Sequence, residues 1–184
     1  MVKGVEVVND QWRHYADISQ CTLCPLKGSD YAFSRVHRGE GKKVMFIGEA
    51  PGEEEAKQHL AFVGKSGKLL DKWIEYLDID NYVITNVVRH RPPNNRSPSD
   101  DEVNLCLPYL YQELQIENPY YIVALGRTAA LALGYMNNKE SMTSVLKKNG
   151  TSRRVVLYHP SYILRTGRDM TEYLDRIKRQ LEEI

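Results

Sequence analysis

The residues with the clearest potential for chemistry are three cysteines and one histidine. Cys21 and Cys24 form a C-x-x-C pair, and His90 and Cys106 follow much later in the chain. Three thiols cannot pair off into disulfides, so this spacing favours metal or redox chemistry. Three thiols and one imidazole suit either zinc or an iron–sulfur cluster. The alternative for Cys106 is a small apolar residue packed on a helix face, which is the commoner role of a buried cysteine.

Four polar or glycine-rich segments follow or end short apolar runs. They are GEAPGEEE at 48–55, Asn86 within YVITNVV, GRTA at 126–129 and HPS at 159–161. Because parallel strands end at one edge of a sheet, these segments should meet at a common rim, where α/β proteins bind ligands. The first loop has neither the lysine spacing nor the third glycine of a nucleotide-phosphate loop. Its glycines, among them Gly52, allow the backbone to approach a ligand closely.

Each rim residue also has an ordinary structural explanation. The acids at 53–55 could start a helix, whose N-terminal dipole favours negative charge, and Phe62 could belong to the core. An exposed face of Phe62 could instead stack on a base. Asn86 interrupts an apolar strand, and a buried amide needs a hydrogen-bond partner or a ligand. His159 could cap a strand end at the surface, whereas Ser161 beside it adds a hydroxyl suited to a phosphate.

The elements that position these residues can be read from the apolar pattern. Four short runs hardly alternate with polar residues, which is typical of strands buried on both faces. The expected strands are Val44–Ile47, Tyr82–Val88, Tyr120–Leu125 and Val155–Tyr158. Segments with helical spacing lie between them, so the sequence predicts an α/β fold with a mainly parallel sheet and helices on both faces.

Some helical segments carry recognisable boundaries. Ser99 and Glu102 form a capping box at the start of one helix, in which Pro108 should produce a kink or an early end. Trp12 with Tyr15 indicates a short helix before the first cysteines. A last helix has an apolar stripe of Leu174, Ile177, Leu181 and Ile184.

The composition limits the classes of protein that remain. The 184 residues are 42% hydrophobic and 27% charged, which predicts one globular domain over residues 1–184. The net charge is +1, so any contact with a polyanion must come from a local patch, for which Arg89, Arg91 and Arg96 are candidates. No apolar run approaches the ~18 residues that span a bilayer, and the start of the chain lacks the apolar stretch of a signal peptide. We expect a cytoplasmic monomer without a membrane partner.

Four motifs carry a resemblance to a known family. GEAPGEEE, FVGKSGKLL, ITNVVRHRPPNNR and HPSYILR stand in this order and spacing. From Cys21 to Arg165 the chain resembles family 4 uracil-DNA glycosylases, the iron–sulfur branch of bacteria and archaea. The resemblance implies a three-layer α/β/α fold around a four-stranded mainly parallel sheet and a [4Fe–4S] cluster. It also implies a monofunctional enzyme of base excision repair that acts on uracil-containing DNA, where it hydrolyses the N-glycosidic bond of a flipped deoxyuridine.

The same resemblance assigns roles to residues of the pocket. Glu49 and Ala50 match the motif that forms the water side of the pocket. Phe62 matches the aromatic residue that stacks on uracil, Asn86 the amide that reads its edge, and His159 the histidine that contacts the base carbonyl.

Residues around the pocket receive expected roles as well. Glu55 matches an acid that crowds the 5-position, where thymine has a methyl group. Gly52 should bring its backbone close to the substrate, and Ser161 should lie near a phosphate. The arginines expected to contact DNA are Arg91, Arg96 and Arg165.

The cluster-ligand positions of the family correspond to Cys21, Cys24, His90 and Cys106. The position of His90 is ordinarily occupied by cysteine in the family. The covalent-trapping UdgX branch also has histidine there, but it carries an extra basic loop with its own reactive histidine. His90 and Cys106 are only 16 positions apart, without such an insertion, which argues against trapping. Further departures from the family pattern are Ala56, His59 and Ala61, which replace Asp, Gly and Pro.

Other functions stay open on the residues alone. A uracil-DNA trapping protein or a non-enzymatic iron–sulfur protein that binds nucleic acid would explain the cysteines and arginines. The non-enzymatic protein would leave Asn86, Phe62 and His159 without a shared purpose. A small-molecule hydrolase that uses Glu49 and His159 would explain the pocket but not the metal ligands. Zinc competes with the expected [4Fe–4S] cluster for the same four residues.

Overall fold

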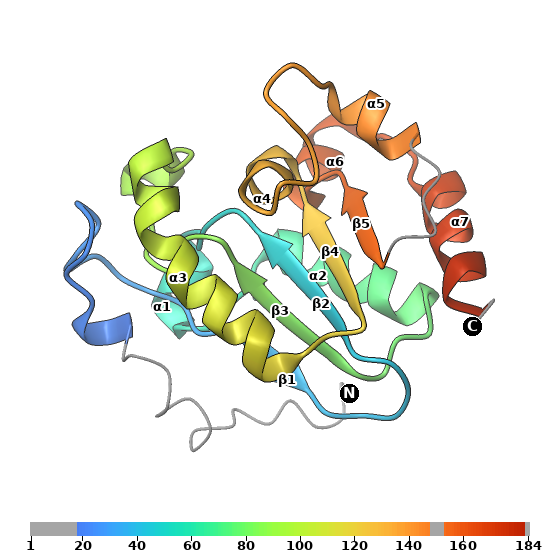
Figure 1. Cartoon of the computed structure of the whole chain (residues 1–184), viewed down its shortest axis with the longest axis horizontal. Coiled ribbons are helices and arrows are strands. Elements are labelled where there is room, and N and C mark those ends of the chain that lie inside the picture. The colour runs from blue at the N-terminus through green and yellow to red at the C-terminus, as the bar shows by residue number, and fades with distance from the viewer. Residues whose placement is uncertain (1–17, 148–152, 183–184) are drawn as a thin grey trace.

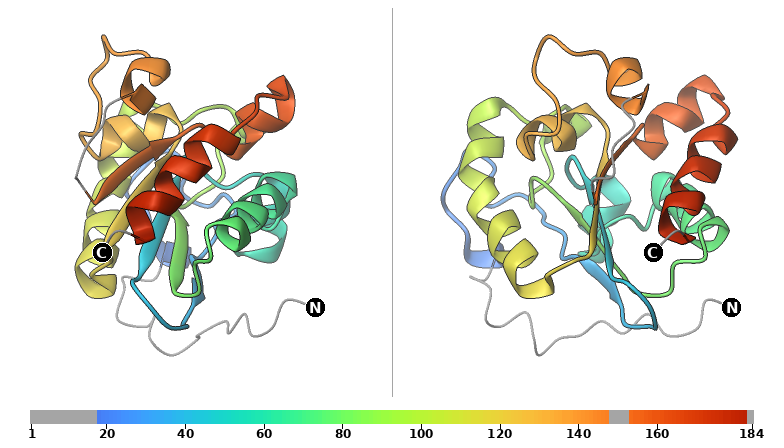
Figure 2. Two further views of the ribbon diagram at one scale, coloured as in Figure 1. Left: turned by 90° about the vertical axis from the view of Figure 1, so that its right-hand side faces the viewer. Right: turned by 45° about the vertical axis from the view of Figure 1, so that its right-hand side comes forward.

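A five-stranded sheet lies between two layers of helices in the computed structural model, which describes residues 18–147 and 153–182 (Figures 1 and 2). The strands are β1 (Arg35–His37), β2 (Val44–Gly48), β3 (Tyr82–Asn86), β4 (Tyr121–Leu125) and β5 (Arg154–Leu157). They are ordered β1-β3-β2-β4-β5, and β2 through β5 are all parallel. The predicted α/β fold and its four parallel strands are confirmed.

The fifth strand was missed by the sequence analysis. β1 pairs antiparallel with β3, with Arg35 opposite Ile84 and His37 opposite Tyr82. It is only three residues long and two of them are basic, so it carries no apolar periodicity. The guanidinium of Arg35, which is 8% exposed in this edge strand, is neutralised by an ion pair with Asp71. The sheet therefore has five strands rather than the four expected.

Seven helices cover the sheet within the described residues. They are α1 (Glu53–Gln58), α2 (Lys65–Tyr76), α3 (Asp100–Glu117), α4 (Arg127–Ala132), α5 (Met142–Lys147), α6 (Pro160–Thr166) and α7 (Thr171–Glu182). Two 3-10 turns occupy Ile18–Gln20 and Pro93–Asn95. The short helix expected around Trp12 and Tyr15, and Ile184 of the last stripe, fall outside the described residues. No helix in the described part of the chain has the length and apolar character needed to cross a membrane.

The sheet divides the core into two apolar clusters. Successive residues of β2 face opposite layers: Val44 and Phe46 pack with α2, α6 and α7, whereas Met45 and Ile47 pack with α3 and α4. These side chains are 2% exposed or less. The nearly continuous apolar run of β2 therefore reflects burial on both faces, as predicted.

Helix α3 begins as expected but does not end early. The Ser99 hydroxyl accepts a hydrogen bond from the backbone N–H of Glu102 at 3.3 Å, and the Glu102 carboxylate accepts one from the N–H of Ser99 at 2.8 Å. The helix then continues through Pro108 to Glu117, and Figure 1 shows it changing direction along its length. The early end was wrong because Pro108 lies on the exposed side, where the freed carbonyl of the preceding turn can meet water.

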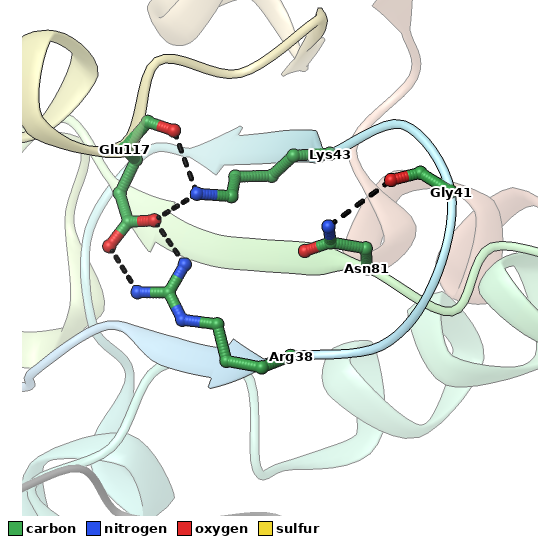
Figure 3. Close-up of polar contacts among 5 residues, drawn as sticks. All are labelled: Arg38, Gly41, Lys43, Asn81 and Glu117. Atoms are coloured by element: carbon green, nitrogen blue, oxygen red, sulfur yellow. Dashed lines mark hydrogen bonds and ion pairs between the residues drawn. The ribbon is translucent and has the colours of Figure 1, made fainter.

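A buried carboxylate holds the end of the sheet where β2 begins. Glu117, at the end of α3, accepts hydrogen bonds from both terminal nitrogens of Arg38, at 2.6 and 2.8 Å, and from Lys43 Nζ at 2.9 Å (Figure 3). Asn81 donates to the Gly41 carbonyl beside them. Burial opposes ionisation of Glu117, but the bonds from Arg38 and Lys43 outweigh it and lower its pKa. The turn between β1 and β2 is thereby fastened to α3.

We expect the capping box to stabilise the protein in a pH-dependent way. Glu102 is paired with Arg96, whose bond, together with the Ser99 N–H, overcomes burial and lowers the pKa of Glu102 from 4.5 to about 2. The ionised carboxylate therefore contributes stability that is complete above pH 4.5 and lost as the pH falls toward 2. Ser99→Ala should lower the free energy of unfolding by about 1 kcal/mol at neutral pH. The deficit of Glu102→Gln should be constant above pH 4.5 and shrink below it, measured by urea unfolding.

The matched control is Glu172→Gln, which removes an exposed acid from the first turn of α7. A deficit for Glu102→Gln that is the same at pH 2 and pH 7 would contradict this account of Glu102.

Candidate active site

The four predicted segments meet at one edge of the sheet. An open cleft of about 880 Å³ lies at the carboxyl ends of the parallel strands, where their arrowheads end in Figure 1. It is bordered by the segments that follow β2, β4 and β5 and by the last residue of β3. The expected site residues that line it are Glu49, Ala50, Gly52, Glu55, Phe62, Asn86, Arg96, His159, Ser161 and Arg165. The convergence predicted from the strand order is therefore present.

Asn86 and Phe62 form one wall of this cleft. Asn86 is 3% exposed, and its Oδ1 has no hydrogen-bond partner among the described residues. A Cβ at Gly48 would lie 2.5 Å from Phe62 Cζ and 2.6 Å from Asn86 Oδ1, so the ring and the amide can meet only above a glycine. Phe62 itself has φ 56°, a left-handed conformation that is costly for an aromatic residue. Phe62 is only 4% exposed and belongs to an apolar core cluster, so the core explanation is correct and the expected exposed face was wrong, although the ring borders the cleft beside the unpartnered Asn86 amide.

His159 presents a defined donor to the same cleft. Its Nδ1 accepts a hydrogen bond from the backbone N–H of Ser161 at 3.2 Å and lies 2.8 Å from the Ser161 hydroxyl. Nδ1 must therefore carry a lone pair, which places the proton of the neutral ring on Nε2. Burial lowers the pKa of His159, and the nearby charges of Glu49 and Glu55 oppose this effect. The rings of Phe62 and His159 are 5.6 Å apart.

The acids of the GEAPGEEE loop have different environments. Glu49 accepts a hydrogen bond from the Thr128 hydroxyl. Glu55 Oε1 accepts bonds from the backbone N–H groups of Val63, at 3.1 Å, and Gly64, at 2.9 Å, so Glu55 anchors the start of α2.

Glu53 and Glu54, the other two acids of this loop, lie at the start of a helix. Glu53 and Glu54 are exposed, lie in the first turn of α1 and form ion pairs with Lys57. For these two residues the helix-start explanation is correct.

The arginines do not form the surface patch that the sequence suggested. Arg89 is 5% exposed and forms a buried ion pair with Glu113, so its expected place in a basic patch was wrong. Arg96 lines the cleft but directs both terminal nitrogens to Glu102, at 2.8 and 2.7 Å. Arg165 lines the cleft beside Tyr162, whereas Arg91 is not among the lining residues and bonds Asn95.

Cys21 and Cys24 lie near enough to Cys106, which belongs to a distant segment, to affect the pKa of its thiol. Burial is the main cause of the raised pKa of Cys106, and the proximity of Cys24 and Cys21 adds to it. All three cysteines are free. This donor set fits a thiolate-bound metal group, although no three His, Cys, Asp or Glu side chains within 18–147 and 153–182 are already arranged to hold a metal ion.

His90 is buried, at 4% exposure, near the described start of the chain. Burial lowers its pKa, and a hydrogen bond from its ring to the backbone of Ile18 opposes this effect. One ring nitrogen is thereby occupied, which leaves the other with a lone pair. Metal-binding histidines commonly have this arrangement.

The sequence analysis missed some residues that line the cleft. Arg127 and Thr128 lie in the GRTA segment that it placed at the rim without giving either residue a role. Lys65 also lines the cleft. Their position directly after a strand or at the start of a helix could have identified them as residues that line the cleft.

Comparison with known proteins gives a consistent result. Residues 37–182 match the family model of the uracil DNA glycosylase superfamily. The chain is 39% identical over 157 residues to a type-4 uracil-DNA glycosylase of Thermotoga maritima, with 80% of each chain covered. It is 38% identical over 162 residues to one of Pyrobaculum aerophilum, covering 80% of this chain and 81% of the relative. It is 32% identical over 174 residues to one of Archaeoglobus fulgidus, covering 89% and 87%. With most of each relative matched at this level, the chain belongs to the type-4 uracil-DNA glycosylases.

Proposed function

We propose that the chain is a monofunctional uracil-DNA glycosylase, which hydrolyses the N-glycosidic bond of deoxyuridine in DNA for base excision repair. The observation that carries this proposal is the meeting of Phe62, the unpartnered Asn86 amide and the Nε2–H donor of His159 in one cleft. The names of the type-4 relatives support the same activity.

Asn86 supplies the discrimination between bases. Uracil presents an N3–H donor beside an O4 acceptor, and cytosine presents the reverse pattern. The Oδ1 of Asn86 can accept from N3–H while its amide nitrogen donates to O4. Cytosine would leave these buried groups unpaired, which costs free energy. Stacking on Phe62 compensates for part of the few kcal/mol needed to extrude the base.

His159 and Glu49 act on the bond that breaks. Cleavage develops positive charge on the sugar and negative charge on the leaving uracil. The neutral His159 ring donates from Nε2 to the uracil O2 and stabilises that negative charge. The Glu49 carboxylate, on the water side of the pocket with Ala50 and Gly52, stabilises the cationic sugar and orients the attacking water. Glu55, held by backbone N–H groups, crowds the 5-position of the base.

The DNA backbone is held by side chains at the border of the cleft. Ser161 and Arg165 contact phosphates from α6. Arg96 contributes as well, because its side chain remains 46% exposed despite its bond to Glu102. Arg91 donates to Asn95 and lies 3.6 Å from the Glu53 carboxylate at the border of the cleft, and it acts on DNA that extends beyond the flipped nucleotide.

A [4Fe–4S] cluster bound by Cys21, Cys24, His90 and Cys106 is part of this proposal. The proximity of Cys21 and Cys24 to Cys106 supports it, as does the hydrogen bond between the buried His90 ring and the backbone of Ile18. The cluster is structural and supplies no step of the reaction. These ligands would tie the segment at 18–24 to α3 and to the loop after β3, which carries Arg91 and Arg96.

Uracil release tests the proposed activity directly. The protein should release free uracil from uracil-containing DNA and leave an intact abasic strand without added divalent metal. His159→Ala should slow single-turnover release by roughly 10²–10³-fold, as expected for one oxyanion donor. Asn86→Ala should also slow uracil release strongly, because the amide that forms hydrogen bonds with the edge of the base is lost.

The matched control is His37→Ala, which removes a histidine in β1, away from the cleft. Wild-type rates in both Asn86→Ala and His159→Ala would remove these residues from the site. Borohydride trapping of a protein–DNA adduct, for example through Lys65, would refute the monofunctional reaction.

The rate should stay constant as the pH falls from 9 to 6.5, the ordinary pKa of histidine. Burial holds the pKa of His159 below 6.5, so the neutral ring with its Nε2–H persists as the pH falls from 8 through 6.5. Protonation would also force Nδ1–H against the Ser161 N–H. Single-turnover rates between pH 5 and 9 should fall only below pH 6.5. A decline centred at or above 6.5 that is absent from His159→Gln would show that this environment is wrongly assigned.

The cluster assignment predicts the metal content. Anaerobically purified protein should be brown and hold about four irons and four sulfides per chain. His90→Ala should lose iron, whereas His90→Cys should keep the cluster with a lower reduction potential, because imidazole ligation raises it. His59→Ala, at an exposed histidine, is the control. A colourless protein with one zinc would contradict the cluster, and unchanged iron and potential in His90→Ala would contradict the ligand.

A further inference from the structure

The turn between β4 and α4 has no role in the function proposed above. Because β4 lies between β2 and β5 in the sheet, this turn enters the cleft between Glu49 and His159. Gly126 has φ 89°, and a Cβ there would lie 3.0 Å from the Cβ of His159. The turn is therefore packed directly against the residue that acts on the leaving base.

Thr128 extends from this turn to the other side of the cleft. Its hydroxyl donates a hydrogen bond to Glu49 Oε2, across 79 positions of sequence. No other hydrogen bond from the described residues reaches the Glu49 carboxylate. One carboxylate oxygen is thus occupied by a donor of the protein, and Oε1 stays available to the cleft that Glu49 lines.

The turn is rigid enough to hold this contact. Arg127 donates to the backbone carbonyls of Asn138 and Glu140, each at 2.8 Å, and so fastens the turn to the segment after α4. The Gly126 N–H donates to the Leu157 carbonyl at 2.7 Å. Threonine is branched at Cβ, which restricts its χ1 rotation.

We propose that Thr128 is a positioning residue, which orients the Glu49 carboxylate so that Oε1 faces the sugar and the attacking water. This inference rests on the role of Glu49 in the proposed function. Without the Thr128 hydroxyl, the Glu49 side chain exchanges among its rotamers. Its Oε1 then spends less time facing the sugar and the attacking water. The Thr128 hydroxyl is committed to Glu49, so we assign its effect to the chemical step rather than to substrate binding.

The test compares Thr128→Val with Thr128→Ser. Valine keeps the shape of threonine without the hydroxyl, and serine keeps the hydroxyl. We expect Thr128→Val to lower kcat for uracil release by roughly 10-fold to 100-fold with KM unchanged, since small misplacements of a reacting group cost up to about 10²-fold. Thr128→Ser should restore most of kcat. Thr143→Val, which removes an exposed hydroxyl bonded to Tyr158, is the control and should keep the wild-type rate.

A double-mutant cycle connects the effect to Glu49. Thr128→Val should have little further effect in a Glu49→Gln background, because the two residues act as one unit. Equal loss of kcat in the valine and serine variants would overturn the inference, as would a change confined to KM. A slow Glu49→Gln with Thr128→Val at the wild-type rate would overturn this inference alone. Absence of uracil release by the unmodified chain would overturn the proposed function and the inference with it.

Discussion

The parallel pairing of β2 with β3 is the constraint on which the rest of this structure depends. Its register places Gly48 opposite Asn86, and neighbouring strands lie about 4.8 Å apart. The amide of Asn86 and the ring of Phe62 can therefore meet over the bare Cα of Gly48. A slip of one residue would turn Asn86 to the other face of the sheet. The wall of the cleft is thus a consequence of strand register, before any ligand binds.

Buried charges hold both ends of this sheet. At one end, Glu117 forms ion pairs with Arg38 and Lys43. At the other, Arg89 pairs with Glu113 and donates to Ser34 at 2.8 Å, which joins the chain after β3 to α3. Burying ions is expensive, and removal of either partner of such a pair would leave an uncompensated buried charge. Arg89 also lies close to Cys106, so the short segment that follows Asn86 leads from the cleft to this cysteine.

Charge near the cleft is balanced rather than strongly positive. Arg89 is buried and Arg96 is paired with Glu102, while Glu49 and Glu55 lie close to His159. With a net charge of +1, the chain has no large field to attract DNA over a distance. Recognition then depends on close contacts with the extruded base and its neighbouring phosphates. His159 stays neutral in this setting because burial lowers its pKa more than the nearby charges of Glu49 and Glu55 raise it.

The sequence by itself determined the alternation of strands and helices, the capping box at Ser99, and the meeting of the polar segments at one rim. These follow from local patterns, because apolar periodicity and caps depend on residues close in the chain. Only the tertiary structure decided the edge strand β1, the burial of Arg89, and the bond between Thr128 and Glu49. Whether His90 binds a metal stays a prediction. Contacts between distant residues depend on strand order and register, which result from the packing of the whole chain and leave no periodic signal in the sequence.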